Sequence, residues 1–113
     1  MNFRRGDIVL VLFPDSNLRT AKRRPALIVQ ADRLETNLSQ TIVAMITSNL
    51  ARGGLSGRVS VRVGCVKGTG LLMDSVVMTD SLATVHYSEI DRVIGTLPEM
   101  KEVDAALRAT LGL

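Results

Sequence analysis

Short apolar runs separated by polar segments are the main pattern along this chain. The clearest runs lie at residues 7–13, 25–30, 41–47 and 75–85. Each is rich in aliphatic residues and has the length of a strand, so each predicts a buried strand. Residues 58–63 alternate polar and apolar positions, which predicts a strand with one face in water, and 93–97 predict a last short strand. The run at 75–85 is expected to bend near Asp80.

Polar segments between these runs predict the connections. Residues 14–24 contain Pro, Asp, Ser and Asn and are interpreted as a long, exposed connection, of a length that is often functional. Residues 48–57 hold three glycines and predict a second loop. Short helical turns are expected at 31–39, where Asp32 would be the cap, and at 88–93.

The C-terminal segment carries the one long helical pattern. Thr96 and Glu99 have the spacing of a capping box, and Pro98 would fall in the first turn, where proline is tolerated. Gly112 predicts the end of the helix. Apolar residues recur at helical spacing at Met100, Val103, Ala106, Leu107 and Leu111. We interpret this stripe as packing against the core or a second subunit, rather than as a cofactor site.

Several short strands followed by one terminal helix indicate a mainly β fold with α, namely a small, partly open β-barrel with a C-terminal amphipathic helix packed on it. The length of 113 residues predicts a single domain spanning residues 1–113, and an apolar content of 46% is typical of a compact globular chain. Aromatic residues make up only 3% of the chain, so the core must consist mainly of aliphatic side chains.

Positive charge gathers in the first half of the chain. The formal net charge is +3, and residues 1–56 hold eight Lys and Arg against four Asp and Glu. Four of these cations stand directly before the predicted second strand, at Arg19, Lys22, Arg23 and Arg24. Such a cluster favours a polyanionic partner, and nucleic acid is the class that we infer. A solubilising surface is the alternative.

The single cysteine, Cys65, excludes an internal disulfide and a metal site built from several thiolates. A reducing cytoplasm fits this composition. The N-terminal residues lack the long apolar core of a signal peptide, and no apolar run approaches about 18 residues. We therefore expect a cytoplasmic protein with no membrane partner.

Five motifs occur in order along the chain: RGDIVLVLFP at 5–14, RRPALIVQ at 23–30, VAMITS at 43–48, GLLMDSVVMTD at 70–80 and GTLP at 95–98. Together they resemble the MazF/PemK family of bacterial toxins from type II toxin–antitoxin systems, and the resemblance spans nearly the whole chain. It implies an SH3-like β-barrel, a homodimer and an mRNA interferase, which is an endoribonuclease that cleaves single-stranded RNA sequence-selectively without metal or other cofactor. It also implies a cognate antitoxin whose acidic, partly disordered segment lies across the RNA groove.

Two catalytic residues are implied by the resemblance. Arg24 matches the arginine directly before the family's PAL strand, and Thr47 matches the hydroxyl residue that ends the third strand. In metal-free RNA cleavage the 2′-hydroxyl attacks the adjacent phosphorus, the 5′-oxygen leaves, and negative charge builds on the non-bridging oxygens. A guanidinium suits that charge because its fork bonds two oxygens at once, and a hydroxyl can add a further hydrogen bond.

The remaining candidates are RNA-binding residues. They are Arg19, Lys22, Arg23, Ser48 and Tyr87. The cations are expected to contact phosphates, and the tyrosine is expected to stack on a base. His86 is the only histidine and would be the usual general base, but nothing in the sequence places it beside Arg24, so the proton acceptor stays open.

The chain departs from the family pattern at two places. Many members carry a lysine before the SVV-type segment and a Gln-x-Arg-Thr stretch after it, where this chain has Met73-Asp74 and Ser-Leu-Ala-Thr at 81–84. The lost cation leaves open whether activity is reduced or directed to a different RNA sequence. Two other functions also stay open: a CcdB-like, non-enzymatic toxin that poisons DNA gyrase, and a nucleic-acid-binding barrel that does not cleave.

Overall fold

The structure is a computed structural model that describes residues 3–14, 21–34 and 36–113. The strands are β1 (Asp7–Pro14), β2 (Ala21–Ile28), β3 (Gln40–Thr47), β4 (Arg58–Val61), β5 (Ser75–His86) and β6 (Ile90–Thr96). The helical elements are the short 3₁₀ turns η1 (Leu50–Arg52) and η2 (Tyr87–Glu89) and the helix α1 (Lys101–Leu111). Arg19 lies outside the described residues.

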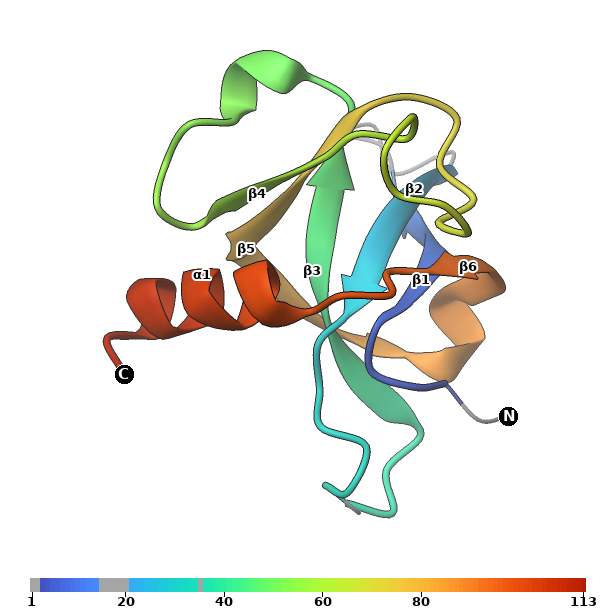
Figure 1. Ribbon diagram of the computed structural model, residues 1–113. Coiled ribbons are helices and arrows are strands. Elements are labelled where there is room, and N and C mark those ends of the chain that lie inside the picture. The colour runs from blue at the N-terminus through green and yellow to red at the C-terminus, as the bar shows by residue number, and fades with distance from the viewer. Residues whose placement is uncertain (1–2, 15–20, 35) are drawn as a thin grey trace.

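One strongly curved antiparallel sheet contains all six strands, in the order β4-β5-β3-β2-β1-β6 (Figure 1). Its edge strands, β4 and β6, do not pair with each other in the described part of the chain, so the sheet is not closed. Helix α1 follows β6 and packs against β5 and β4. These features confirm the mainly β fold with a partly open barrel and a C-terminal helix.

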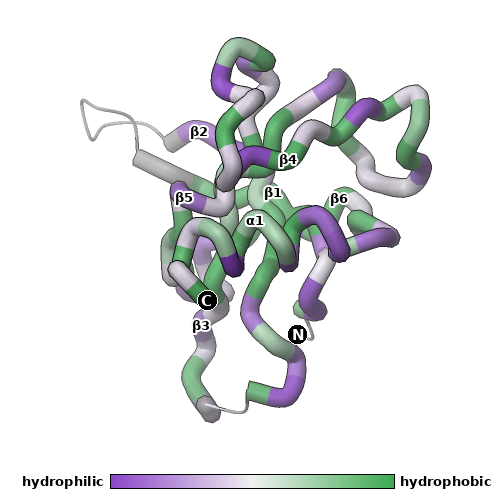
Figure 2. Tube along the Cα trace, turned by 60° about the vertical axis from the view of Figure 1, so that its left-hand side comes forward, coloured by the Kyte–Doolittle hydropathy of each residue, from purple (hydrophilic) through white to green (hydrophobic). Residues whose placement is uncertain are grey.

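Both faces of the sheet are buried at its centre. Ile8 and Val9 follow one another on β1, so their side chains point to opposite faces, and they belong to two separate core clusters. The cluster around Ile8 also contains Val103 and Ala106 of α1. Burial on both faces explains why the central strands read as continuous apolar runs instead of alternating patterns. Figure 2 shows these strands as mainly hydrophobic, whereas hydrophilic and hydrophobic stretches alternate around α1.

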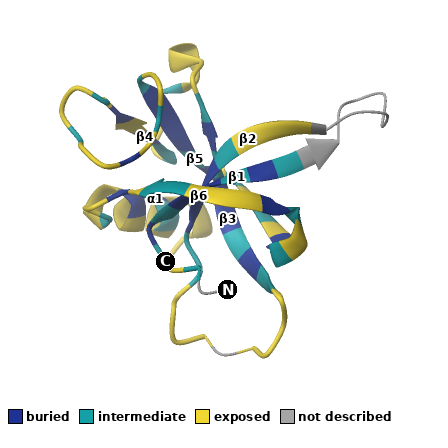
Figure 3. Cartoon of the chain, turned by 90° about the vertical axis from the view of Figure 1, so that its right-hand side faces the viewer, coloured by how far each residue is buried: buried dark blue, intermediate teal, exposed yellow. Residues whose placement is uncertain are grey.

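The prediction that residues 14–24 form one long connection was wrong. Strand β2 already begins at Ala21, and its cationic residues pair with β1, Leu12 opposite Arg23 and Val11 opposite Arg24. The pattern failed because strand pairing uses backbone groups, which cations supply as well as apolar residues do. Figure 3 shows this part of β2 as exposed where it projects beyond the core.

The expected helical turn at 31–39 was also wrong, because the described residues of this segment form turns and bends without a helix. Asp32 does not cap a helix; its Oδ1 accepts a hydrogen bond from the backbone nitrogen of Arg5 at 2.7 Å. The turn expected at 88–93 is the shorter η2, after which β6 begins at Ile90. The loop at 48–57 contains η1.

The bend expected near Asp80 is confirmed as an irregularity in the pairing of β5 with β3. Met45 lies opposite Met78, whereas its neighbour Ala44 lies opposite Leu82, so β5 carries extra residues at this point. Such a bulge bends a strand and increases its twist. Asp80 therefore leaves the regular ladder and turns toward β4, where it meets Arg58.

The start of the C-terminal helix differs from the prediction. Thr96 ends β6, and α1 begins at Lys101 without a side-chain cap. Glu99 instead accepts a hydrogen bond from the backbone nitrogen of Lys101 at 3.0 Å. The predicted stop is confirmed, because Gly112 adopts the left-handed conformation, with a φ of 72°. Among the described helices, none has the length and apolar character needed to span a membrane.

Candidate functional site

A cleft of about 1010 Å³ opens where the first part of β2 and the end of β3 meet β5, β6 and the loop at 62–74. Five sequence-predicted site residues from β2, from β3 and from the residue after β3 line it: Lys22, Arg23, Arg24, Thr47 and Ser48. The residues that the sequence placed in two separate motifs therefore share one concave surface.

Strand pairing brings Arg24 and Thr47 together. The β2–β3 ladder pairs Ala26 with Met45. Arg24 lies two residues before Ala26, and Thr47 lies two residues after Met45. Because the strands are antiparallel, Arg24 and Thr47 lie at matching positions on neighbouring strands. Since residues two apart on a strand share a face, both side chains project from the same face of the sheet, just beyond the pairing of Ala26 with Met45. Each lies beside a buried valine of a neighbouring strand, because Arg24 pairs with Val11 and Thr47 pairs with Val76.

The Thr47 hydroxyl is oriented by the turn that follows it. Its Oγ1 accepts a hydrogen bond from the backbone nitrogen of Asn49 at 3.2 Å. The Asn49 side chain in turn accepts from the backbone nitrogen of Ala51 at 3.2 Å and so caps η1. Because the oxygen of Thr47 already accepts a bond, its O–H proton can be donated to an anion in the cleft.

The cleft is strongly electropositive. Besides the three cations of β2, it is lined by Arg52 and Arg92, and no carboxylate is among its described lining residues. Asp91 stands just outside and pairs with Arg23 at 3.1 Å and with Arg92 at 3.3 Å. None of the ion pairs among the described residues includes Arg24. Arg24 lines the cleft together with these cations.

Sequence reasoning missed Arg52 and Arg92. Arg52 was read as part of a loop, although it follows the ITS motif by only a few residues. Arg92 was read as part of a helical turn, whereas it lies on β6 opposite Leu10. Residues 90–92 do not alternate between apolar and polar positions, so no pattern indicated that β6 begins at Ile90.

The opposite wall of the cleft is apolar. It is built largely by residues of the loop at 62–74 and of β5: Leu71, Leu72, Met73, Met78, Leu82 and Ala83. Three of the residues that depart from the family pattern, Met73, Leu82 and Ala83, therefore lie on this wall. Leu72 is 96% exposed, so its side chain is available to a ligand. Asp74 turns away from the cleft, and its Oδ1 accepts a hydrogen bond from the backbone nitrogen of Val63 at 2.9 Å.

Tyr87 and His86 do not join this site. Tyr87 packs on Phe3, with ring centroids 5.0 Å apart, beside a separate hollow of about 600 Å³ that Arg4 also lines. His86 ends β5 and is not a lining residue of the cleft; its backbone nitrogen donates to the carboxylate of Glu89 at 2.8 Å. Among the described residues, no group of three or more His, Cys, Asp or Glu is arranged to hold a metal ion.

An open antiparallel sheet that carries an arginine, a threonine and further cations around one cleft defines the chain as a small β protein with a cationic cleft. The family model of the PemK-like, MazF-like toxin of type II toxin–antitoxin systems matches residues 4–111. The chain belongs to this family.

Named relatives agree with this membership. Endoribonuclease MazF2 of Mycobacterium bovis and Endoribonuclease MazF6 of Mycobacterium tuberculosis are each 36% identical over 105 residues, which cover 90% of this chain and 90% of the relative. The probable endoribonuclease MazF of Mycolicibacterium smegmatis is 34% identical over 97% of both chains. The chain is thus a toxin-family endoribonuclease, and the gyrase-poisoning alternative is not favoured.

Solved structures share the fold. Mycobacterium tuberculosis toxin MazF-mt6 superimposes with a TM-score of 0.74 at 27% identity, over 95% of this chain and 97% of that one. An endoribonuclease from a mycobacterial species, solved in complex with its cognate antitoxin, gives a TM-score of 0.77 at 19% identity, over 99% and 97% of the two chains. At that identity the second likeness supports the fold alone.

Proposed function

We propose that this chain cleaves single-stranded RNA sequence-selectively and without a metal ion, with Arg24 and Thr47 at the scissile phosphate. The observation that carries the proposal is their position on two adjacent strands, just beyond the pairing of Ala26 with Met45, in a cationic cleft that no described carboxylate lines. A carboxylate there would repel the phosphate and would compete with it for the arginine.

The proposed reaction needs charge stabilisation above all. The 2′-oxygen of the RNA forms a bond to phosphorus, the bond to the 5′-oxygen breaks, and a cyclic 2′,3′-phosphate remains. The 2′-hydroxyl loses its proton to a base or to water, and the leaving 5′-oxygen takes up a proton. Arg24 donates two hydrogen bonds to the non-bridging oxygens, and Thr47 donates a third. Each such donor typically contributes about 2.7–4 kcal/mol to transition-state stabilisation.

The experiment is cleavage of single-stranded RNA in the presence of EDTA. Arg24→Ala is expected to lower kcat about 100- to 1000-fold, the usual effect of removing one donor to a developing charge. Arg33→Ala is the matched control, since Arg33 is exposed and lines neither the cleft nor the second hollow. Full activity of a folded Arg24→Ala protein would overturn the assignment.

Neighbouring residues extend the proposal to substrate binding. Lys22 and Ser48 line the cleft beside the catalytic pair, and we assign them to phosphates or sugars next to the scissile bond. Arg23 shares this role although Asp91 neutralises part of its charge. Arg19, which is not described, and Tyr87, which lies by the second hollow, stay predictions for more distant nucleotides.

The proposed assembly is a homodimer neutralised by a cognate antitoxin. One structural relative was solved as an endoribonuclease in complex with its cognate antitoxin, and the cationic cleft of this chain suits an acidic segment equally well. An acidic antitoxin segment and RNA are then expected to compete for the cleft. Simultaneous binding of both in a titration would contradict this, and a monomer at micromolar concentration in light scattering would contradict the dimer.

A further inference from the structure

We propose that Arg52 is a second phosphate-binding guanidinium of this endoribonuclease and that the ion pair between Arg58 and Asp80 positions it. The inference rests on the proposed function and deepens it, because it adds a substrate-binding residue and the contacts that hold that residue in place.

Arg52 stands close to the catalytic threonine along a short hydrogen-bonded path. It is the last residue of η1 and lines the same cleft as Thr47 and Arg24. The path begins at the Thr47 hydroxyl, which bonds the backbone of Asn49, and continues through the Asn49 side chain to the backbone of Ala51. The position of Arg52 is therefore coupled to that of Thr47 through a capped turn.

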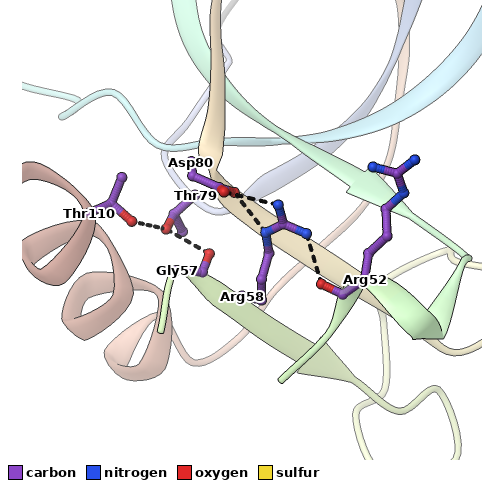
Figure 4. Close-up of polar contacts among 6 residues, drawn as sticks. All are labelled: Arg52, Gly57, Arg58, Thr79, Asp80 and Thr110. Atoms are coloured by element: carbon purple, nitrogen blue, oxygen red, sulfur yellow. Dashed lines mark hydrogen bonds and ion pairs between the residues drawn. The ribbon is translucent and has the colours of Figure 1, made fainter. Parts of the chain in front are cut away.

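Arg58 fixes the other end of this turn. Its Nε and Nη2 donate to the two carboxylate oxygens of Asp80 at 2.7 and 2.9 Å, and its Nη1 donates to the backbone carbonyl of Arg52 at 2.7 Å (Figure 4). One planar guanidinium thus joins β5 to the end of η1. The Arg58 side chain is only 14% exposed, so it is held among its neighbours.

The pairing also decides which arginine is available to a ligand. Both groups of the Arg58–Asp80 pair are stabilised in their charged forms, mainly by their hydrogen bonds, which raise the pKa of Arg58 and lower that of Asp80. Figure 4 shows the Arg52 guanidinium extending away from this pair, while its carbonyl faces Arg58. Because Asp80 compensates the charge of Arg58, it also reduces the repulsion between the two arginines.

The segment between these arginines is anchored to the helix as well. The Thr79 hydroxyl donates to the carbonyl of Gly57 at 2.8 Å, and since it has one proton, Thr110 of α1 must donate to Thr79 at 2.9 Å. A Cβ on Gly57 would lie 2.7 Å from the Thr110 hydroxyl, so a larger residue at this position would displace the Thr110 side chain. The loop that carries Arg52 is therefore fixed at both of its ends.

This arrangement predicts a division between the two cleft arginines. Arg24 faces the scissile phosphate and affects kcat, whereas Arg52 binds a neighbouring phosphate and affects KM. Arg52→Ala is expected to raise KM about tenfold, as for the loss of one charge-assisted hydrogen bond, with kcat nearly unchanged.

The test is a double-mutant cycle on binding of a single-stranded RNA pool of mixed sequence that carries 2′-O-methyl groups and cannot be cleaved. Arg52→Ala should weaken binding about tenfold and reduce the slope of log Kd against log salt by about 0.7. Arg58→Ala should also weaken RNA binding. The double variant should be no more than about twofold weaker than Arg52→Ala, because Arg58 acts through Arg52.

Two further variants keep the test decisive. Arg62→Ala removes an exposed arginine that does not line the cleft, and it should leave affinity unchanged. Asp80→Asn replaces Arg58→Ala in the cycle if the latter fails to fold, as judged by circular dichroism. Wild-type affinity and salt slope in Arg52→Ala would overturn the role of Arg52, and additive effects would overturn the positioning by Arg58.

Cleavage by Arg24→Ala, measured in parallel, separates this inference from the proposed function. A fully active Arg24→Ala protein would overturn the proposed function itself. An inactive Arg24→Ala protein together with an Arg52→Ala protein of wild-type KM would overturn only the role of Arg52.

Discussion

The side chain of Asp80 on β5 combines exposure with a fixed position. Asp80 is half-exposed, yet both of its oxygens bond Arg58, and the bulge of β5 turns it toward that partner. A bidentate pair of this kind has more geometric specificity than an ordinary surface ion pair. Because the pair lowers the pKa of Asp80, it stabilises the folded protein at neutral pH and less so in acid.

Asp80→Asn is expected to lower the free energy of unfolding at neutral pH and to have progressively less effect in acid. The folded protein keeps Asp80 ionised at pH values where the unfolded chain takes up a proton, so the stabilisation is complete above the ordinary Asp pKa of about 3.9. This stabilisation is lost as the pH falls through the lowered pKa of Asp80 in the folded protein. Urea unfolding of both proteins from neutral to acidic pH measures this, and a difference that does not change with pH would contradict it.

The candidate site was partly predictable from the sequence, for a physical reason. The resemblance to the toxin family pointed to Arg24 and Thr47, and the pairing of β2 with β3 brings them together. Arg52 was not predictable, because its place depends on a turn capped by Asn49 and on a long-range bond from Arg58. Hydrogen bonds between backbone carbonyls and distant side chains produce no periodic pattern in the amino-acid sequence.

At the scale of elements, the loop at 62–74 is held against β6 by backbone contacts. The backbone nitrogen of Thr96 donates to the carbonyl of Gly68 at 2.9 Å. A Cβ on Gly95 would lie 2.4 Å from the Gly68 carbonyl oxygen and equally close to the Thr69 backbone. Only glycine at position 95 permits this contact, which places the apolar wall of the cleft opposite its cations.

Gly95→Ala is expected to destabilise the fold by about 1–3 kcal/mol, the usual cost of forcing extra volume into a packed position. Gly64→Ala is the matched control from the same loop, since a Cβ there meets nothing within 4 Å, and its effect should stay within about 0.5 kcal/mol. Denaturant unfolding compares the two. Equal changes in the free energy of unfolding would show that the close contact between the loop and β6 does not contribute to stability.

Element boundaries were predicted well where burial determines them and poorly elsewhere. The apolar segments of β1, β3 and β5 are buried, and the sequence indicated each of them. The start of β2 was missed because its exposed cations are held by pairing with β1 and not by burial. The start of α1 was missed because Thr96 is needed as the last residue of β6, which overrides its capping potential.

At the scale of the whole molecule, α1 covers one end of the curved sheet. Val103 is completely buried in the core cluster that contains Ile8, whereas Leu111 near the end of the helix is 56% exposed. The same apolar stripe thus begins in the core and ends at the surface. This agrees with the interpretation of the stripe as packing against the core.

Val103→Ala should lower the free energy of unfolding by about 2 kcal/mol, from lost burial and from the cavity left behind. Leu111→Ala removes more carbon atoms but should cost no more than about 0.5 kcal/mol in the monomer, because its side chain is largely in water. Thermal unfolding at two protein concentrations measures both. A concentration-dependent loss in Leu111→Ala would show that a second copy covers this residue.

Because the loop at 62–74 is attached through its backbone, its exposed side chains can be substituted without loss of the fold. The hydrogen bond to β6 uses the carbonyl of Gly68, so the side chains of Leu72 and Met73 are not needed to hold the wall. The side chains on the apolar wall are therefore separable from the proposed nuclease centre on β2 and β3. Randomising those two positions should yield enzymes that cut different transcripts by the same reaction, with unchanged folding.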